Sequence, residues 1–173
     1  QNDAGIGVKN GINWMGRKNF IGTFTPPVAV INDFAFLDTL SPRQRRSGLA
    51  EAVKVALIKD RAFFGFLYDQ RAELAVFSQR PMETMIYRCA ALHMQHIGQG
   101  GDPFELGSAR PLDFGHWSAH KLEELTDGRI NHGEAVAIGM AVDSLYSNRC
   151  GMIEDDALRQ ILTLIGDLKL PIY

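Results

Sequence analysis

The sequence predicts a mainly α-helical fold, and three observations support this prediction. From Ser41 onward, apolar residues recur at helical spacing in one segment after another. A single short apolar run, residues 28–31, has the character of a β-strand. No internal repeat or low-complexity tract interrupts the chain, so the helices are expected to share one core. We therefore expect a multihelical domain preceded by a glycine-rich loop and one short strand.

The first forty residues are expected to form loop and strand. Five glycines lie between residues 4 and 25, among Lys9, Lys18 and Asn19. Because glycine tolerates positive φ angles, such a segment can approach a phosphate group closely. The glycines do not form the G-x-G-x-x-G fingerprint, and no strand–turn–helix pattern surrounds them. The chain thus shows no nucleotide-binding fold of its own.

The first predicted helix begins after Ser41 and ends near Lys59. Ser41 supplies an N-cap, a proline follows it, and Gln44 completes a capping box. Glu51 and Lys54 are three residues apart, so they can share one face of this helix. Glu51 also lies in a stretch that is more apolar than a solvated helix face usually is. A carboxylate in such a place requires a partner.

The rest of the chain repeats this helical pattern. Further helices are expected at about 60–69, 81–98, 114–126, 132–149 and 154–168. We interpret residues 1–173 as one domain, with 1–40 as an interdomain loop and strand region and 41–173 as the helical core. The chain starts without Met, within an apparent functional loop. This start predicts a piece of a longer protein.

Composition and charge exclude several classes of function. The formal net charge is −2, and the basic residues are scattered apart from a cluster at 43–46, so no broad basic field for nucleic acid exists. No apolar run approaches the ~20 residues of a membrane span, and the first residues lack a signal-peptide pattern. We expect a soluble, cytoplasmic protein. Cys89 and Cys150 both lie in apolar helical patterns and are expected to be buried, reduced core residues.

Two histidines fall at predicted helix starts. His116 and His120 are four residues apart, so a helix would project both from one face, and two imidazoles on one face can bind zinc. Such pairs also occur on ordinary helix surfaces. Asp113 can cap that helix, while residues 131–134 read as an N-cap and capping box around His132. The positive end of a helix dipole favours the neutral imidazole that a metal requires.

Spacing alone does not select a set of ligands, but several segments resemble motifs of the 3-dehydroquinate synthase family. The metal motifs of that family are resembled by Gly48–Lys54, Phe114–His116 and His132–Gly139. Further family segments are resembled by Asp3–Lys9, Gly16–Asn19 and Phe36–Thr39. The resemblance implies a helical C-terminal domain that binds zinc or cobalt. It also implies a partner N-terminal α/β domain that binds most of an NAD molecule, and a homodimer of the full-length protein.

The resemblance also implies roles for individual residues. The metal ligands would be Glu51, His116 and His132. Catalysis would involve Lys54, Glu105 and His120. The substrate or its phosphate would be bound by Asp3, Lys9, Asn19, His93, Arg110 and Asp113. NAD would be contacted by Lys18, Phe36, Leu37, Asp38 and Thr39. A His/His/Glu set with open positions is typical of catalytic rather than structural zinc.

The implied reaction converts a heptulosonate 7-phosphate into a carbocycle. NAD oxidises a hydroxyl, phosphate is eliminated, the hydride returns, and an aldol step closes the ring. Two positions that contact the substrate carboxylate in the family differ here: His93 replaces a Lys, and Ala109 replaces an Arg that is shifted to Arg110. Asp113 stands where the family usually has an Asn near the phosphate. These changes leave open a substrate without that carboxylate, sedoheptulose 7-phosphate, as in cyclases similar to 2-epi-5-epi-valiolone synthase.

Two other classes of function stay open. A metal-dependent alcohol or glycerol dehydrogenase would also use NAD but would perform net oxidation, and the lysines favour a phosphate-bearing substrate instead. A non-catalytic module would have kept the fold without tight metal binding. Under the cyclase interpretation, the isolated chain is expected to be inactive because the main NAD site lies in the partner domain.

Overall fold

The computed structural model is mostly helical, which confirms the predicted fold class. It describes residues 5–15, 17–99 and 113–173, apart from the side chains at positions 9, 13, 17–19 and 99. The N-terminal elements are strands β1 (Lys9–Trp14) and β2 (Arg17–Phe24) and the 3-10 helix η1 (Phe34–Thr39). The helices are α1 (Pro42–Lys59), α2 (Arg61–Asp69), α3 (Arg71–Ala75), α4 (Gln79–Gln99), α5 (His116–Leu125), α6 (His132–Arg149) and α7 (Asp155–Asp167).

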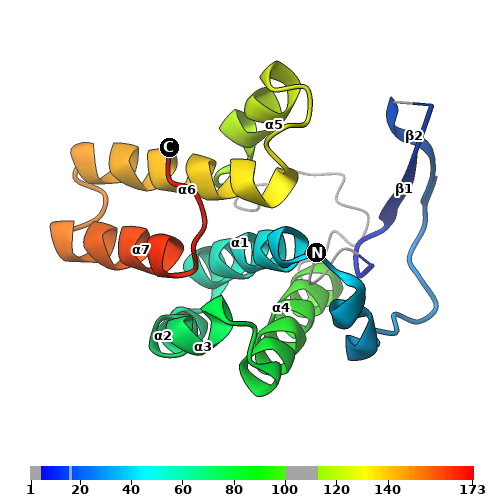
Figure 1. Ribbon diagram of the computed structural model, residues 1–173, viewed down its shortest axis with the longest axis horizontal. Coiled ribbons are helices and arrows are strands. Elements are labelled where there is room, and N and C mark those ends of the chain that lie inside the picture. The colour runs from blue at the N-terminus through cyan, green and yellow to red at the C-terminus, as the bar shows by residue number, and fades with distance from the viewer. Residues whose placement is uncertain (1–4, 16, 100–112) are drawn as a thin grey trace.

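Helix α1 lies at the centre of the helical body, with α6 and α7 on one side and α2 and α4 on another (Figure 1). Residues 49–56 of α1 are all buried, so this helix is enclosed all round and has no solvated face along that stretch. The core around it includes Leu49, Val53, Phe63, Met140 and Leu164. This central position carries Glu51 and Lys54 into the interior.

Both capping boxes that the sequence predicts are present. The Ser41 hydroxyl accepts the Gln44 N–H at 3.3 Å, and the Gln44 side chain accepts the Ser41 N–H at 3.1 Å. At the start of α6, Asn131 Oδ1 accepts the Glu134 N–H at 2.9 Å, and Glu134 Oε2 accepts the Asn131 N–H at 3.0 Å. These caps fix the first turns of α1 and α6.

The start of α5 differs from the expectation that Asp113 caps it. The N-cap is Gly115, in the left-handed region with φ 74°. It has no side chain to accept a helix N–H, and its own N–H donates to Asp143 Oδ2 at 2.7 Å. Asp113 contributes its backbone carbonyl, which accepts the His116 N–H at 2.8 Å, while its side chain is exposed. A Cβ at residue 115 would lie 2.8 Å from the Met140 side chain, so glycine is required at this close turn.

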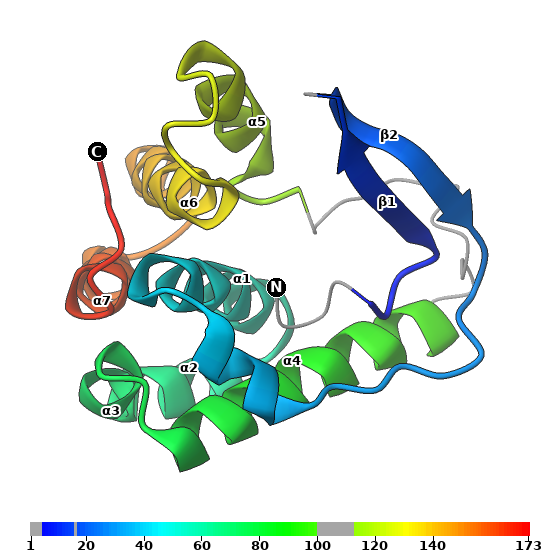
Figure 2. The same cartoon turned by 45° about the vertical axis from the view of Figure 1, so that its right-hand side comes forward.

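The N-terminal prediction was wrong in two respects. Residues 28–31 are not a strand: they pair with no other strand in the described residues, and Val28 and Ile31 are exposed. An apolar run forms a strand only when its backbone groups find a partner. The expected glycine-rich loop instead contains the antiparallel pair β1–β2, with Gly11 opposite Gly22. Figures 1 and 2 show this hairpin at the edge of the molecule, beside the helical body.

Two further features concern the surface. Cys89 is buried as expected, but Cys150 is exposed because it caps the C-terminal end of α6, outside the core. Every helix in the described ranges is too short or too polar to span a lipid bilayer.

Candidate metal centre

Three side chains from three helices converge on one point beside α1. His116 Nε2, from the first turn of α5, lies 3.5 Å from Glu51 Oε1. His132 Nε2, from the first turn of α6, lies 3.3 Å from the same oxygen. Potential ligand atoms of the three residues all lie within 4.8 Å of one another. One divalent ion between them would be within reach of two imidazoles and one carboxylate.

Two glycine contacts allow the helices to approach this closely. A Cβ at Gly133 would lie 2.2 Å from the Ser47 carbonyl oxygen, so α6 can cross α1 at this distance only with glycine at that position. A Cβ at Gly139 would lie 2.0 Å from the Gly115 carbonyl oxygen, which gives the same requirement between α6 and the start of α5. His132 directly precedes Gly133, and His116 directly follows Gly115. The glycines therefore bring both imidazoles toward Glu51.

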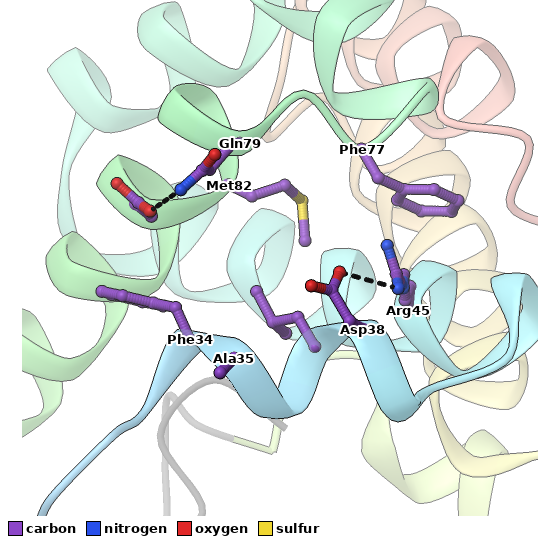
Figure 3. Close-up of a pocket in the computed structure, with 9 residues that line it drawn as sticks. Phe34, Ala35, Asp38, Arg45, Phe77, Gln79 and Met82 are labelled. Atoms are coloured by element: carbon purple, nitrogen blue, oxygen red, sulfur yellow. Dashed lines mark hydrogen bonds and ion pairs between the residues drawn. The ribbon is translucent and has the colours of Figure 1, made fainter.

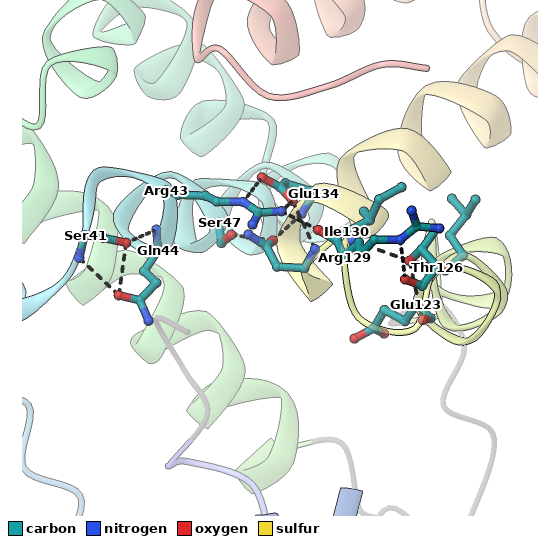
Figure 4. Close-up of polar contacts among 11 residues, drawn as sticks. Ser41, Arg43, Gln44, Ser47, Glu123, Thr126, Arg129, Ile130 and Glu134 are labelled. Carbon is teal, nitrogen blue, oxygen red and sulfur yellow. Dashed lines mark hydrogen bonds and ion pairs between the residues drawn. The ribbon is translucent and has the colours of Figure 1, made fainter. Parts of the chain in front are cut away.

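A polar clamp holds the start of α6 on α1 (Figure 4). Arg43 donates to both carboxylate oxygens of Glu134, at 2.7 and 2.5 Å, and to the Arg129 carbonyl at 2.6 Å. The Ser47 hydroxyl donates to Asn131 Oδ1 at 2.6 Å. Arg43, Ser47 and Glu51 are spaced four residues apart, so they lie along one face of α1. The face of α1 that holds α6 is therefore the face that carries Glu51.

Glu51 is an ionised, buried carboxylate with one oxygen unsatisfied. The residue is only 5% exposed, and its Oε2 accepts from Lys54 Nζ at 2.6 Å. Its Oε1 is buried and has no hydrogen-bond partner in the described part of the chain. Burial raises the pKa of the Glu51 carboxyl, but the facing His116 and His132 and the Lys54 ammonium lower it more, to well below its usual value. An anionic oxygen that faces two imidazole nitrogens fits a metal ion.

Each imidazole is oriented through its other nitrogen. His116 Nδ1 lies 3.1 Å from the Phe114 carbonyl oxygen, and His132 Nδ1 lies 3.0 Å from Glu123 Oε2. Because both partners are acceptors, each Nδ1 carries a proton, and Nε2, which faces Glu51, is the nitrogen that a metal ion would use. Glu51 raises the pKa of His132, burial lowers it, and Glu123 raises it again, so the net shift is upward. The donor set is thus arranged for a cation at Nε2.

The sequence profile described as "3-dehydroquinate synthase C-terminal" matches residues 48–173, and the one described as "3-dehydroquinate synthase N-terminal" matches residues 1–47. The chain belongs to the 3-dehydroquinate synthase family. It is 40% identical over 172 residues to a 3-dehydroquinate synthase of Geotalea uraniireducens, covering 99% of this chain and 47% of that protein. It is 36% identical over 173 residues to a 2-epi-valiolone synthase of Actinosynnema mirum, covering 99% of this chain and 45% of that protein.

Solved structures of sugar phosphate cyclases have the same fold. The 2-epi-5-epi-valiolone synthase of Streptomyces hygroscopicus, with NAD⁺ and Zn²⁺ bound, superposes with a TM-score of 0.85 at 33% identity, over 99% of this chain and 48% of that one. A 2-deoxy-scyllo-inosose synthase complexed with carbaglucose-6-phosphate, NAD⁺ and Co²⁺ gives 0.79 at 27% identity, over 96% and 45%. The chain therefore spans about half the length of the relatives it matches.

Other residues that the family resemblance selects surround this centre. Lys54 is buried against Glu51. The His120 ring centroid lies 5.7 Å from that of His116 and 6.1 Å from that of His132, and His120 is exposed. A hollow of about 270 Å³ opens beside Glu51 and His132. This hollow leaves room for a small molecule next to Glu51 and His132.

The segment that the resemblance assigns to NAD forms η1. Phe36, Asp38 and Thr39 are exposed there, and Leu37 is partly buried. A cavity of about 350 Å³ separates η1 from the start of α4 (Figure 3). Within it, Arg45 donates to Asp38 Oδ1 at 3.2 Å. Of the predicted cofactor residues, Leu37 and Asp38 line this cavity.

Of the remaining predicted residues, one lies on α4, one lies just before α5, and the others, or their side chains, fall outside the described residues. His93 is partly buried on α4, next to Gly7: a Cβ on that glycine would meet the His93 ring at 4.0 Å. Asp113 is exposed just before α5. Outside the described residues lie Asp3, Glu105 and Arg110, and so do the side chains of Lys9, Lys18 and Asn19.

Glu123, which contacts His132, was not predicted from the sequence. A signal was available, because Glu123 follows His120 by three residues and His116 by seven, so all three lie along one face of a helix. What the spacing does not reveal is that α6 brings His132 to this face. That contact depends on the packing of α5 against α6.

Proposed function

We propose that this chain is the metal-binding half of a sugar phosphate cyclase of the 3-dehydroquinate synthase type. The observation that carries this proposal is the convergence of Glu51, His116 and His132 around a buried carboxylate oxygen that has no hydrogen-bond partner in the described residues. The identities of 36% and 40% to named cyclases support the class of reaction. Because the chain spans about half of those proteins, we propose the activity for the whole protein.

The three side chains would hold a zinc or cobalt ion. Two imidazoles and one carboxylate leave coordination positions open, which is the arrangement of catalytic sites. The ion would act as a Lewis acid toward a hydroxyl or ketone oxygen of the substrate. Lys54 keeps Glu51 ionised by its contact of 2.6 Å and would place a positive charge beside the ion. In this proposal residues 1–40 lie between the two halves, and 41–173 form the metal domain.

NAD would serve as the redox cofactor, and its site would lie mainly in the other half of the protein. NAD would accept a hydride from the substrate and return it within one turnover. In this chain, Phe36–Thr39 and Lys18 would contact it. Between the two hydride transfers, phosphate would leave by elimination, which makes the enzyme a lyase, and an aldol step would close the ring. Lys9, Asn19, Lys54 and His120 would hold the phosphate, and Glu105 would accept a proton.

The substrate proposed first is a heptulosonate 7-phosphate, as for the 3-dehydroquinate synthases. One observation favours a second candidate, sedoheptulose 7-phosphate: His93 stands at a position where the resemblance implies a carboxylate-binding Lys. The imidazole is shorter than a lysine side chain, and it is partly buried beside the N-terminal segment. If His93 binds a substrate carboxylate more weakly than a lysine would, a substrate without a carboxylate is favoured. Asp3, Arg110 and Asp113 would complete the substrate site.

The test is a parallel assay of the whole protein with 3-deoxy-D-arabino-heptulosonate 7-phosphate and sedoheptulose 7-phosphate. Phosphate release is followed with zinc or cobalt present and NAD at catalytic concentration. Release from either substrate without accumulation of NADH is expected. Release from neither contradicts the cyclase proposal, and NADH accumulation with a simple polyol supports a dehydrogenase instead. We further propose that the whole protein is a cytoplasmic homodimer and that the isolated chain has no turnover.

A further inference from the structure

Glu123 makes a contact that the metal ligands themselves do not explain. Its Oε2 lies 3.0 Å from His132 Nδ1, and both side chains are largely shielded, with 20% and 24% of their surfaces exposed. Glu123 belongs to α5, whereas His132 begins α6. The contact therefore joins the two helices at the edge of the candidate metal centre.

The segment between these two residues is braced by hydrogen bonds (Figure 4). The Thr126 hydroxyl donates to the Leu122 carbonyl at 2.7 Å and accepts the Ile130 N–H at 3.4 Å. Arg129 Nε donates to the Thr126 carbonyl at 3.1 Å, and the Arg129 carbonyl accepts from Arg43. Glu123 thus reaches His132 from a turn whose backbone is held in place.

A second metal site is the competing interpretation, since His120, Glu123 and His132 also have potential ligand atoms within 4.8 Å of one another. His132 has two ring nitrogens, and its Nε2 already faces Glu51. To bind a second ion through Nδ1, the ring would have to lose both protons. A carboxylate that accepts the Nδ1 proton requires no such step, and it matches the common partnership of carboxylate, histidine and metal.

We propose that Glu123 is a positioning residue for the metal: it holds the His132 ring in one tautomer and one orientation, with Nε2 directed at the ion. This inference rests on the proposed metal centre and deepens it. Glu123 would not touch the ion or the substrate. Its carboxylate would raise the basicity of His132 as a ligand and limit rotation of the ring.

The test compares zinc affinity in the whole protein, measured by competition with a chromophoric chelator. Glu123→Ala removes the acceptor, and Glu123→Gln keeps an acceptor oxygen without the charge. Glu124→Gln is the matched control, because Glu124 is the adjacent acid, is exposed and pairs with Lys121 at 2.9 Å. We expect Glu123→Ala to weaken zinc binding by roughly 10–100-fold. Glu123→Gln should weaken zinc binding less than Glu123→Ala does, and Glu124→Gln should bind zinc as tightly as the wild type.

A second readout separates positioning from general damage. The Co²⁺ absorption spectrum reports ligand geometry, and it should change in Glu123→Ala but not in Glu124→Gln. The melting temperatures of the metal-free variants should agree. Equal zinc affinities for Glu123→Ala and Glu124→Gln would overturn the positioning role of Glu123 but would leave the metal centre standing. Two zinc ions in the wild type, one of them lost in Glu123→Ala, overturn it too, since Glu123 is then a ligand. A wild type that binds no zinc refutes the metal centre itself.

Discussion

Glu51 illustrates how one residue can be kept charged inside a protein. Burial of a lone carboxylate costs several kcal/mol, so a buried one requires compensation. Lys54, one turn away, supplies a direct ion pair at 2.6 Å, and both side chains are less than a tenth exposed. The imidazoles of His116 and His132 face the other carboxylate oxygen. The side chain is therefore held ionised and directed at the centre.

This account predicts a large cost for Lys54→Met in the metal-free protein. The change leaves the Glu51 carboxylate buried without its cation, and loss of one partner of a buried pair typically costs about 3–5 kcal/mol. Lys59→Met is the control, since Lys59 lies at the exposed end of the same helix and contacts His96 Nδ1. It should change stability by less than about 0.5 kcal/mol. Urea unfolding measures both, and equal effects would argue against a buried ion pair.

Among the individual residues of the site, some could be predicted from the sequence and others could not. The partnership of Glu51 and Lys54 follows from helical spacing and an apolar surrounding. The choice of His116 and His132 as partners of Glu51 does not, because it depends on how three helices pack. Motif resemblance supplied that choice. Glu123 was not predicted, because its contact with His132 depends on the same packing.

At the scale of elements, the close crossing of α1 and α6 decides whether the centre can form. Gly133 meets the backbone of Ser47, and the Arg43–Glu134 clamp holds the start of α6 beside it. Exposed ion pairs contribute little to stability by themselves, and more than half of the Arg43 side chain surface is exposed. The clamp therefore acts through geometry, by fixing the first turn of α6.

Gly133→Ala is expected to destabilise the protein and to weaken metal binding. Its Cβ would meet backbone atoms that cannot move aside, and overpacking of this kind typically costs about 1–3 kcal/mol. Gly65→Ala is the matched control, because Gly65 lies within α2 and a Cβ there meets nothing within 4 Å. That change should stabilise by roughly 0.5–1 kcal/mol through helix propensity. Thermal unfolding with and without zinc measures the stability and the metal binding of both variants. A change in stability of the same sign in Gly133→Ala and Gly65→Ala would contradict the close crossing of α1 and α6.

Which elements could be predicted depended on whether their signals were local. The capping boxes of α1 and α6 are encoded within four residues, and both were predicted correctly. The turn before α5 depends on contact between Gly115 and α6, so the predicted Asp113 cap was wrong. The strand at 28–31 was wrong for a related reason. A strand requires a partner, and none of the described segments pairs with it.

At the scale of the whole molecule, the candidate centre joins the central helix to two others. α1, α5 and α6 each contribute one ligand residue, and α6 packs against both α1 and α5. An ion bound there would stabilise only the folded arrangement, because the unfolded chain does not bring the three residues together. The central position of α1 thus links the fold directly to the proposed chemistry.

The central claim is that Glu51, His116 and His132 hold one metal ion, and the metal content of the whole protein tests it most directly. Elemental analysis of the freshly purified wild type should find one zinc or cobalt ion per chain. Glu51→Gln should lose that ion, because the change removes the anionic ligand while keeping the size of the side chain. The absence of zinc and cobalt from the wild type, or full metal content in Glu51→Gln, would contradict the account.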